Sequence, residues 1–241
     1  MSVYFISDLH LSQERPDMTG AFLRFCRNLP ADSKALYILG DFLEYWVGDD
    51  EDAAWLEPIK HALLRTSQDI CPVFFMHGNR DFLIGKKFAR ETGMQLLPEP
   101  SLIDLYGQRV LILHGDSLCT QDVSYQKYRK VVRNKIIQFL FLLLPLKTRH
   151  KIFGAGREKS KQKQKCISNM QILDVTPQAV SELMDNYQTD LLIHGHTHRP
   201  AIHQNARNAC RGTRIVLGDW YTQGSILEVS EDGYMLTSMP L

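Results

Sequence analysis

Six short apolar runs recur along the chain, and each ends in a polar or glycine-bearing turn. They are VYFISDLH (3–10), ALYILGD (35–41), PVFFMHGNRD (72–81), RVLILHGD (109–116), DLLIHGHTH (190–198) and RIVLGDW (214–220). Runs of this length and composition are typical of parallel strands that are buried on both faces. Helical patterns lie between the early runs, at 17–28, 52–68 and 83–92. This alternation of strands and helices predicts an α/β fold with a largely parallel sheet.

Both ends of the chain add to this prediction. SILEVS (225–230) and GYMLTSM (233–239), joined by an EDG-type turn, predict a closing antiparallel strand pair. The first apolar run follows almost directly on Met1, without a basic segment or a cleavable apolar stretch, so we expect no secretory signal. Five scattered cysteines form no CxxC pair, which argues against a disulfide framework or a thiolate zinc site and fits a reducing cytosol.

The charge of the chain is strongly segregated, although the formal net charge is only +1. Residues 127–165 hold 13 Lys or Arg and one acidic residue, Glu158, which gives this segment a net charge of +12. The rest of the chain holds 15 basic and 26 acidic residues, a net charge of −11. A basic segment on an acidic body indicates an anionic partner: a nucleic acid, phospholipid headgroups or a phosphorylated substrate.

Residues 120–172 interrupt the alternation, with a helical stretch at 121–144, a proline at 145 and the run REKSKQKQK at 157–165. We interpret them as a helical cap inserted into a single domain that spans residues 1–241. The apolar stretch IIQFLFLLLPL (136–146) is shorter than the ~20 residues that a transmembrane helix needs. Two interpretations of it stay open: the buried face of a cap helix, or an exposed surface for acyl chains or a bilayer interface.

Polar side chains that bind metal ions follow five of the apolar runs. They are Asp8, His10, Asp41, Asn79, His114, His196 and His198. Each has an ordinary structural explanation when taken singly, but ligands of α/β sheets bind where the carboxyl ends of strands converge. Carboxylates, imidazoles and an amide without thiolates suit Mn²⁺, Fe²⁺ or Mg²⁺. Seven ligands exceed the need of one catalytic ion, so the pattern predicts two metals, an arrangement that favours phosphoester hydrolysis. His77 and His194 precede glycines inside their runs and are expected either to support the ligands or to be structural.

Five short motifs carry a resemblance to a known family. In chain order ISDLH (6–10), LGD (39–41), GNRD (78–81), HGD (114–116) and GHTH (195–198) resemble the motif set of the calcineurin-like metallophosphoesterases. The resemblance implies an α+β sandwich, in which a double β-sheet core is flanked by helices. It also implies two sets of metal ligands, with Asp41 bridging: Asp8, His10, Asp41 and His198 for one ion, and Asp41, Asn79, His114 and His196 for the other.

Four longer stretches narrow the resemblance to one branch of the family. They are LYILGDFLEYWVGDD (36–50), GNRDFLIG (78–85), HGDSLCTQDVSYQKYR (114–129) and IHGHTHRP (193–200). This branch hydrolyses the pyrophosphate of a lipid-linked UDP-sugar in lipid A synthesis. The resemblance implies that a hydroxide held by two divalent ions, expected to be Mn²⁺, attacks the phosphorus nearest the nucleoside. It also implies a protein bound peripherally to the cytoplasmic face of the inner membrane, through the basic and apolar insertion.

The resemblance also implies residues that contact the substrate. The motif GNRD departs from the common family pattern GNHD: Arg80 cannot donate its proton at ordinary pH, but it can bind phosphate oxygens bidentately. Asn79 and His196 are expected beside it. Asp122 resembles a substrate contact, with a solvated acid before a helix as the alternative. In the cap, Ser160 matches a substrate-contacting position, while Gln164 and Lys165 are either further counterparts or solvated residues of a charged run. Trp46 and Phe82 are expected to line an acyl cavity with 136–146.

Two other functions compete with this hypothesis. The first is another hydrolase of the same architecture, such as a cyclic-nucleotide phosphodiesterase, a protein phosphatase or a nuclease. We expect no nucleic-acid partner, because the apolar half of the basic segment lacks the interleaved aromatic residues that stack on single strands. The second is a scaffold on a degenerate fold of this type. Such a scaffold would have lost ligands, and all seven positions are present in this chain.

Overall fold

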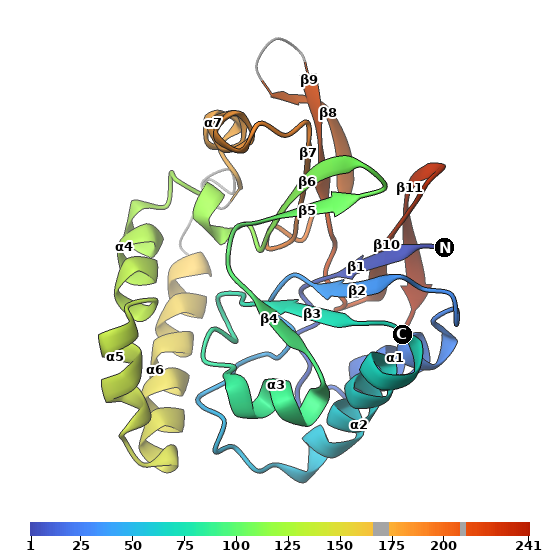
Figure 1. Ribbon diagram of the computed structural model, residues 1–241. Coiled ribbons are helices and arrows are strands. Elements are labelled where there is room, and N and C mark those ends of the chain that lie inside the picture. The colour runs from blue at the N-terminus through green and yellow to red at the C-terminus, as the bar shows by residue number, and fades with distance from the viewer. Residues whose placement is uncertain (166–173, 208–210) are drawn as a thin grey trace.

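Two β-sheets lie at the centre of the computed structural model, which describes residues 1–165, 174–207 and 211–241 but not the side chains of residues 157–165 and 207 (Figure 1). One sheet has the order β11-β10-β1-β2-β3-β4 and the other the order β5-β6-β7-β9-β8. The strands of the first sheet are β1 (Val3–Ile6), β2 (Ala35–Ile38), β3 (Val73–Met76), β4 (Gln95–Leu97), β10 (Gln223–Ser230) and β11 (Gly233–Pro240). Those of the second are β5 (Ser101–Leu105), β6 (Gln108–Leu113), β7 (Leu191–His194), β8 (Ala201–Arg207) and β9 (Arg211–Val216).

All six apolar runs form strands, but they divide between two sheets. β1, β2 and β3 pair in parallel in the first sheet, and β6, β7 and β9 pair in parallel in the second. The predicted closing pair is the antiparallel ladder of β10 and β11, and β10 also pairs antiparallel with β1. The double β-sheet core implied by the family resemblance is therefore confirmed, while a single largely parallel sheet would be wrong.

Each face of the first sheet packs on a different apolar layer, which explains why β1, β2 and β3 are apolar at every position. In β1, Tyr4 and Ile6 join a core shared with the helices, whereas Val3 and Phe5 join the core between the two sheets. Successive side chains of a strand point to opposite faces, so a strand buried on both faces has no polar positions.

Helices cover the outer faces of both sheets (Figure 1). The helices of the first sheet are α1 (Pro16–Asn28), α2 (Glu57–Arg65) and α3 (Lys86–Thr92). The buried side of α1 includes Met18, Phe22 and Phe25, which pack in the same core as Ile6. On the second sheet, α7 (Pro177–Tyr187) contributes Val180 and Met184 to the buried cluster that contains the strands of that sheet.

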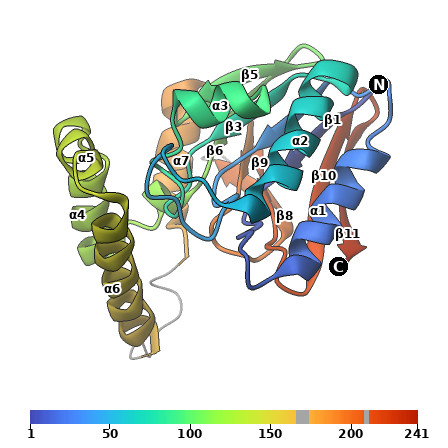
Figure 2. The same cartoon turned by 90° about the horizontal axis from the view of Figure 1, so that it is seen from below.

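Three further helices, α4 (Val123–Val132), α5 (Lys135–Leu142) and α6 (Leu146–Lys165), stand to one side of the two sheets (Figure 2). We refer to residues 123–165 as the cap. The helix expected at 121–144 is two helices, because the side chain of Asn134 accepts hydrogen bonds from the backbone of Ile136 and Ile137 and starts α5 afresh. None of the described helices is long and apolar enough to cross a membrane.

Candidate metal centre

The seven predicted ligands converge at the carboxyl ends of five strands from both sheets. Asp8 and His10 follow β1, Asp41 follows β2, Asn79 follows β3, His114 follows β6, and His196 and His198 follow β7. Their donor atoms form two adjoining groups, and within each group the atoms lie close together.

One group contains two histidines and an aspartate. The Nε2 atoms of His10 and His198 are 3.4 Å apart, and His198 Nε2 lies 3.3 Å from Asp8 Oδ1. Asp41 borders this group, with Oδ2 at 4.0 Å from His10 Nε2. Ligands that each bind one ion at ~2.1 Å lie ~3–4 Å from one another, so these atoms have the spacing of a metal site. The group could hold one divalent ion.

The other group is built around an amide oxygen. Asn79 Oδ1 lies 3.0 Å from His114 Nε2 and 2.9 Å from His196 Nδ1. Asp41 borders this group too, because its second oxygen, Oδ1, lies 3.7 Å from His114 Nε2. The two oxygens of Asp41 therefore face different groups, as those of a bridging ligand would.

Backbone conformation turns the ligands inward. φ is positive, between 48° and 69°, at Asp8, His10, Asp41, His196 and His198. For residues with a Cβ this left-handed conformation costs ~1–3 kcal/mol each, and it persists only where the surrounding structure imposes it. Strain at five ligand positions is a mark of a functional site rather than of a folding core.

Three histidines are oriented by an acceptor on the side of the ring away from the cluster. His10 Nδ1 lies 3.1 Å from Glu44 Oε2, and His198 Nδ1 lies 3.0 Å from Asp219 Oδ2. His114 Nδ1 donates to the backbone oxygen of Leu39 at 2.8 Å. In all three rings Nε2 is left to face the cluster, which is how metal-binding histidines are normally held.

Sequence reasoning missed Glu44 and Asp219. Asp219 ends the run LGD (217–219), which repeats the LGD (39–41) that contains Asp41, and this repetition was the available signal. Glu44 had no comparable signal, since it follows Asp41 by three residues in a loop whose path only the tertiary structure defines.

The charges around the cluster fit divalent cations. Burial opposes protonation of His114, but the carboxylates of Asp41 and Asp8 outweigh it and raise its pKa to about 9. Burial acts in the same way on His198, whose hydrogen bonds with Asp219 and Asp8 raise its pKa to about 10. The pKa of His196 instead falls to about 4, because the ring is buried and lies near His114. The site thus draws positive charge toward its carboxylates, and a metal ion can replace these protons.

Asp8 is held so that one oxygen faces the cluster. Its Oδ2 accepts hydrogen bonds from Ser7 Oγ at 2.6 Å and from the backbone N–H of His196 at 2.8 Å. This leaves Oδ1 beside His198, in a position to bind an ion. Asp8 is fully buried, and an ionised carboxylate at such a depth requires partners of positive charge.

His77 and His194 lie outside the cluster and have structural partners. His194 donates from Nδ1 to the backbone oxygen of Gly195 at 2.8 Å, and its Nε2 lies 3.1 Å from Arg214 Nη1. His77 Nε2 donates to the backbone oxygen of Ile84 at 2.7 Å. Burial lowers the pKa of His194 to about 3 and that of His77 to about 4, so both rings are neutral.

Arg80 borders the cluster, next to Asn79. Its backbone N–H donates to Asp41 Oδ1 at 2.8 Å, and its backbone oxygen accepts from Trp46 at 3.1 Å. Among the described residues no carboxylate forms an ion pair with its guanidinium, and Nε is buried without a hydrogen bond. A surface salt bridge therefore does not explain this arginine.

The other predicted substrate contacts lie in or next to the cap. Asp122 caps α4, since Oδ1 accepts from the backbone N–H of Tyr125 at 2.9 Å. Ser160, Gln164 and Lys165 fall on the last turns of α6, and their side chains lie outside the described part of the chain.

Trp46 and Phe82, which are expected to line an acyl cavity, are only 3% and 8% exposed. Both are buried in the core of the first sheet, where the rings of Trp46 and Phe88 lie 5.0 Å apart. The sequence alone does not distinguish an apolar side chain that lines a cavity from one that packs in the core. In this structure both side chains pack in the core.

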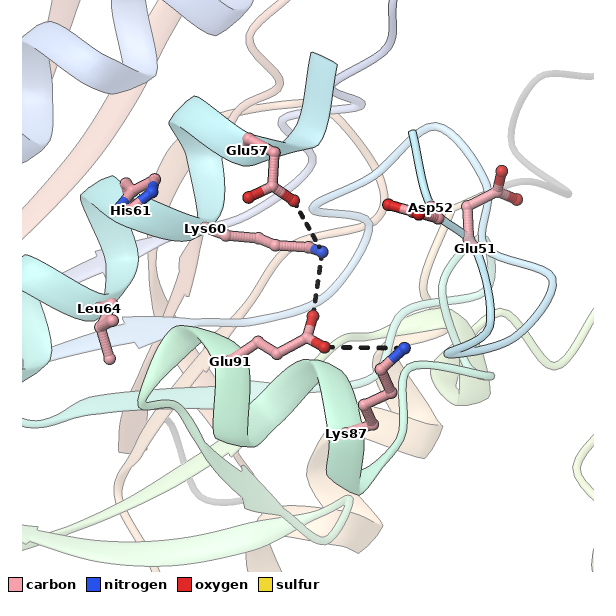
Figure 3. Close-up of a pocket in the computed structure, with 8 residues that line it drawn as sticks. All are labelled: Glu51, Asp52, Glu57, Lys60, His61, Leu64, Lys87 and Glu91. Atoms are coloured by element: carbon pink, nitrogen blue, oxygen red, sulfur yellow. Dashed lines mark hydrogen bonds and ion pairs between the residues drawn. The ribbon is translucent and has the colours of Figure 1, made fainter. Parts of the chain in front are cut away.

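A separate cavity of about 360 Å³ lies between α2, α3 and residues 51–52 (Figure 3). Charged residues of this cavity pair with one another. Lys60 Nζ lies 3.1 Å from Glu57 Oε1 and 2.9 Å from Glu91 Oε2, and Lys87 Nζ lies 3.7 Å from Glu91 Oε1. None of the predicted site residues lines this cavity, so it is not a candidate for the active site.

Glu44→Gln is expected to weaken metal binding about 10–100-fold without unfolding the protein, because the amide no longer fixes His10 as a carboxylate does. Isothermal titration with Mn²⁺ measures the affinity, and thermal unfolding reports the stability. Glu14→Gln, which removes an exposed carboxylate, is the matched control. Equal affinity in the Glu44 variant and the wild type would mean that Glu44 does not support His10.

Comparisons with known proteins agree with this geometry. Residues 1–200 match the family described as calcineurin-like phosphoesterase. The chain is 48% identical to UDP-2,3-diacylglucosamine hydrolase of Serratia proteamaculans, with 100% of both chains covered. It is also 48% identical to the protein of the same name from Histophilus somni, over 96% of this chain and 97% of that one. The solved structure of an archaeal phosphodiesterase has a similar fold, with a TM-score of 0.50 at 12% identity over 99% of this chain and 100% of that one. The chain therefore belongs to the calcineurin-like phosphoesterase family.

Proposed function

We propose that this protein hydrolyses the pyrophosphate of UDP-2,3-diacylglucosamine to UMP and 2,3-diacylglucosamine 1-phosphate, a step of lipid A synthesis. The observation that carries the proposal is a complete seven-residue cluster beside an arginine that forms no ion pair with any described carboxylate. Full-length similarity to hydrolases named for this substrate supports it, since a shared fold alone would leave the substrate open.

The metal ligands follow from the two groups of distances. Asp8, His10, Asp41 and His198 would hold one divalent ion, and Asp41, Asn79, His114 and His196 the other. We expect Mn²⁺, which accepts this mixture of carboxylate, imidazole and amide ligands. Two such ions would polarise the phosphoryl oxygens and lower the pKa of a bound water.

Protein side chains orient the reacting pyrophosphate. Arg80 presents a planar set of donors that matches two phosphate oxygens, and no described acid competes for it. Together with His196 and His114 it lies where negative charge develops on the transferring phosphoryl group, and preorganised donors there stabilise the transition state. The ring of Tyr125, on α4 of the cap, stacks on His196 with centroids 6.2 Å apart. The cap thus reaches the edge of the centre from which a substrate would enter.

Conversion of UDP-2,3-diacylglucosamine with Mn²⁺ tests the proposal. In H₂¹⁸O, mass spectrometry is expected to find UMP that carries the label and unlabelled diacylglucosamine 1-phosphate, because attack occurs at the phosphorus nearest the nucleoside. Label in the lipid product would move the attack to the other phosphorus. If the protein hydrolysed a simple phosphodiester but did not convert the lipid substrate, the assignment of the metal centre would stand and the assignment of the substrate would be refuted.

The cap supplies a surface for the lipid. No side chain of α5 is buried, and four apolar residues are more than half exposed: Ile136 at 70%, Phe139 at 63%, Leu140 at 56% and Leu143 at 66%. Of the two interpretations of residues 136–146, the exposed one fits this geometry. Residues 127–165, which contain this stretch, carry 13 Lys or Arg and one acidic residue, and such a positive charge attracts anionic headgroups. We therefore propose peripheral binding of the cap to the cytoplasmic face of the inner membrane.

Phe139→Ser with Leu140→Ser is expected to reduce binding to vesicles that contain phosphatidylglycerol by about tenfold or more. The reason is the loss of two apolar side chains, each worth up to ~1.5–3 kcal/mol when buried. Sedimentation with vesicles measures the binding. Leu102→Ser with Ile202→Ser removes two exposed apolar residues outside the cap and is expected to change nothing. Equal loss in both double variants, or none in either, would exclude α5 as the membrane contact.

A further inference from the structure

Arg149, in the first turn of α6, is almost fully buried although it belongs to the most exposed part of the protein. Its side chain is 2% exposed. The guanidinium donates to the backbone oxygens of Val47 at 2.6 Å and Leu144 at 2.9 Å, and it forms an ion pair with Asp50. A buried guanidinium is costly unless its donors are paired, and here they are paired by two elements far apart in sequence. The hydrolysis described above does not use this residue.

The backbone around Arg149 is shaped to receive it. Gly48 has a φ of +144°, and a Cβ at this position would collide with Arg149 Nη1. The neighbours of Arg149 strengthen the contact: His150 Nε2 lies 2.8 Å from Glu51 Oε2, and the rings of Phe153 and Tyr45 lie 5.6 Å apart. The start of α6 is therefore seated on the loop of residues 44–51, which we call the seat loop.

The seat loop also contacts the metal centre and the loop that contains Arg80. Glu44 orients His10, and the backbone N–H of Trp46 donates to the backbone oxygen of Arg80 at 3.1 Å. At its far end the carboxylate of Asp49 accepts from backbone N–H groups at the start of α3, at 2.9–3.1 Å. One short segment thus joins the cap to the groups that would hold the pyrophosphate.

The other end of the cap is attached independently. On α4, Arg129 donates to Asp116 Oδ2 and to Glu99 Oε2, both at 2.8 Å. The hydroxyl of Tyr125 also donates to Asp116, at 2.5 Å. Loss of the Arg149 contact would therefore loosen the start of α6 without detaching α4.

A change of angle at the start of a helix moves its later turns by a distance that grows along the helix. Residues 160–165 lie 11–16 positions beyond Arg149 on α6, which corresponds to ~16–24 Å at 1.5 Å per residue. A tilt of ~10° at the seat loop would move them by ~3–4 Å. Misplacement of a bound group by 1 Å can lower a reaction rate ~10²-fold.

We propose that Arg149 is a positioning residue that fixes the angle of α6 to the metal centre and so selects a substrate long enough to reach both. This inference rests on the proposed function for its substrate. It assigns a specificity role to a residue that is expected to contact neither the metals nor the substrate.

Arg149→Met tests the proposal, because methionine keeps the apolar stem and removes the donors. The expected result is a KM for UDP-2,3-diacylglucosamine about 10–100-fold higher, with Mn²⁺ affinity and hydrolysis of bis(p-nitrophenyl) phosphate unchanged. Asp50→Asn should show a smaller effect of the same kind. Asp52→Asn, an exposed acid two residues away, is the control and should behave as the wild type. Equal loss on both substrates, or no loss on either, would overturn the proposal.

Hydrogen exchange separates failure of the inference from failure of the proposed function. In Arg149→Met, amides of residues 45–51 and 146–156 should exchange faster, while those of β1 and of α4 should keep the wild-type rate. Unchanged exchange in these two segments would refute the anchoring itself, whichever substrate the enzyme uses. A wild-type protein that leaves the diacylated nucleotide intact would refute the substrate, and the exchange experiment would still decide whether Arg149 anchors α6.

Discussion

Asp41→Asn is expected to lower kcat at least ~10³-fold while the protein stays folded. Each oxygen of Asp41 faces a different group of ligands, Oδ2 toward His10 and Oδ1 toward His114, so the substitution weakens both proposed ion sites at once. Loss of a residue that merely supports a ligand costs ~10–100-fold, and loss of a ligand shared by two ions must exceed that. Asparagine has the same shape and keeps an oxygen that can accept from the backbone N–H of Arg80.

Three measurements on this variant separate the metal role from a folding defect. Metal analysis of the purified protein is expected to show fewer bound ions than the wild type, circular dichroism an unchanged spectrum, and steady-state kinetics the loss of kcat. Asp104→Asn, which changes an exposed residue of β5, is the matched control. Wild-type turnover by Asp41→Asn would end the assignment of Asp41 as the bridging ligand.

Arg80→Ala is expected to lower kcat/KM on the diacylated nucleotide about 10²–10³-fold, the size of effect seen when one preorganised donor to a transition state is removed. The loss on bis(p-nitrophenyl) phosphate should be much smaller, because that diester has one phosphorus and needs no second cationic group beside the metals. The structural reason is that the guanidinium has no carboxylate partner among the described residues. A group without a structural partner can be removed with little cost to stability.

Two further variants define what Arg80 contributes. Arg80→Lys keeps the charge but loses the planar pair of donors, so it should recover only part of the activity. Arg90→Ala removes an exposed arginine of α3 and should leave both substrates unaffected. Equal losses on the two substrates in Arg80→Ala would mean that Arg80 serves the metal cluster and not the pyrophosphate.

The strands and the cluster could be predicted because their signals are local. A strand buried on both faces must be apolar throughout, and the polar residues that end such strands are visible at once in β1, β2, β3, β6 and β7. Helix α7 and strands β4, β5 and β8 were not predicted. β5 alternates exposed and less exposed residues, and α7 shows only two buried side chains, so neither has a strong pattern.

Residues 136–146 illustrate the opposite case. The stretch is as apolar as a core helix, yet α5 buries none of its side chains, and in the described part of the chain nothing covers Phe139 or Leu143. Apolar composition specifies only that a side chain favours leaving water. Whether protein or lipid receives it depends on which elements pack beside it.

The sequence by itself determined the apolar strands, the seven predicted metal ligands at their ends and the segregation of basic charge into the cap. These follow from composition and from spacings of a few residues. Only the tertiary structure decided which strands share a sheet, that Glu44 and Asp219 orient His10 and His198, and that Arg149 seats α6 on residues 44–51. The reason is physical: these contacts join residues far apart in the chain or along loops without periodicity, so their geometry exists only once both sheets have packed.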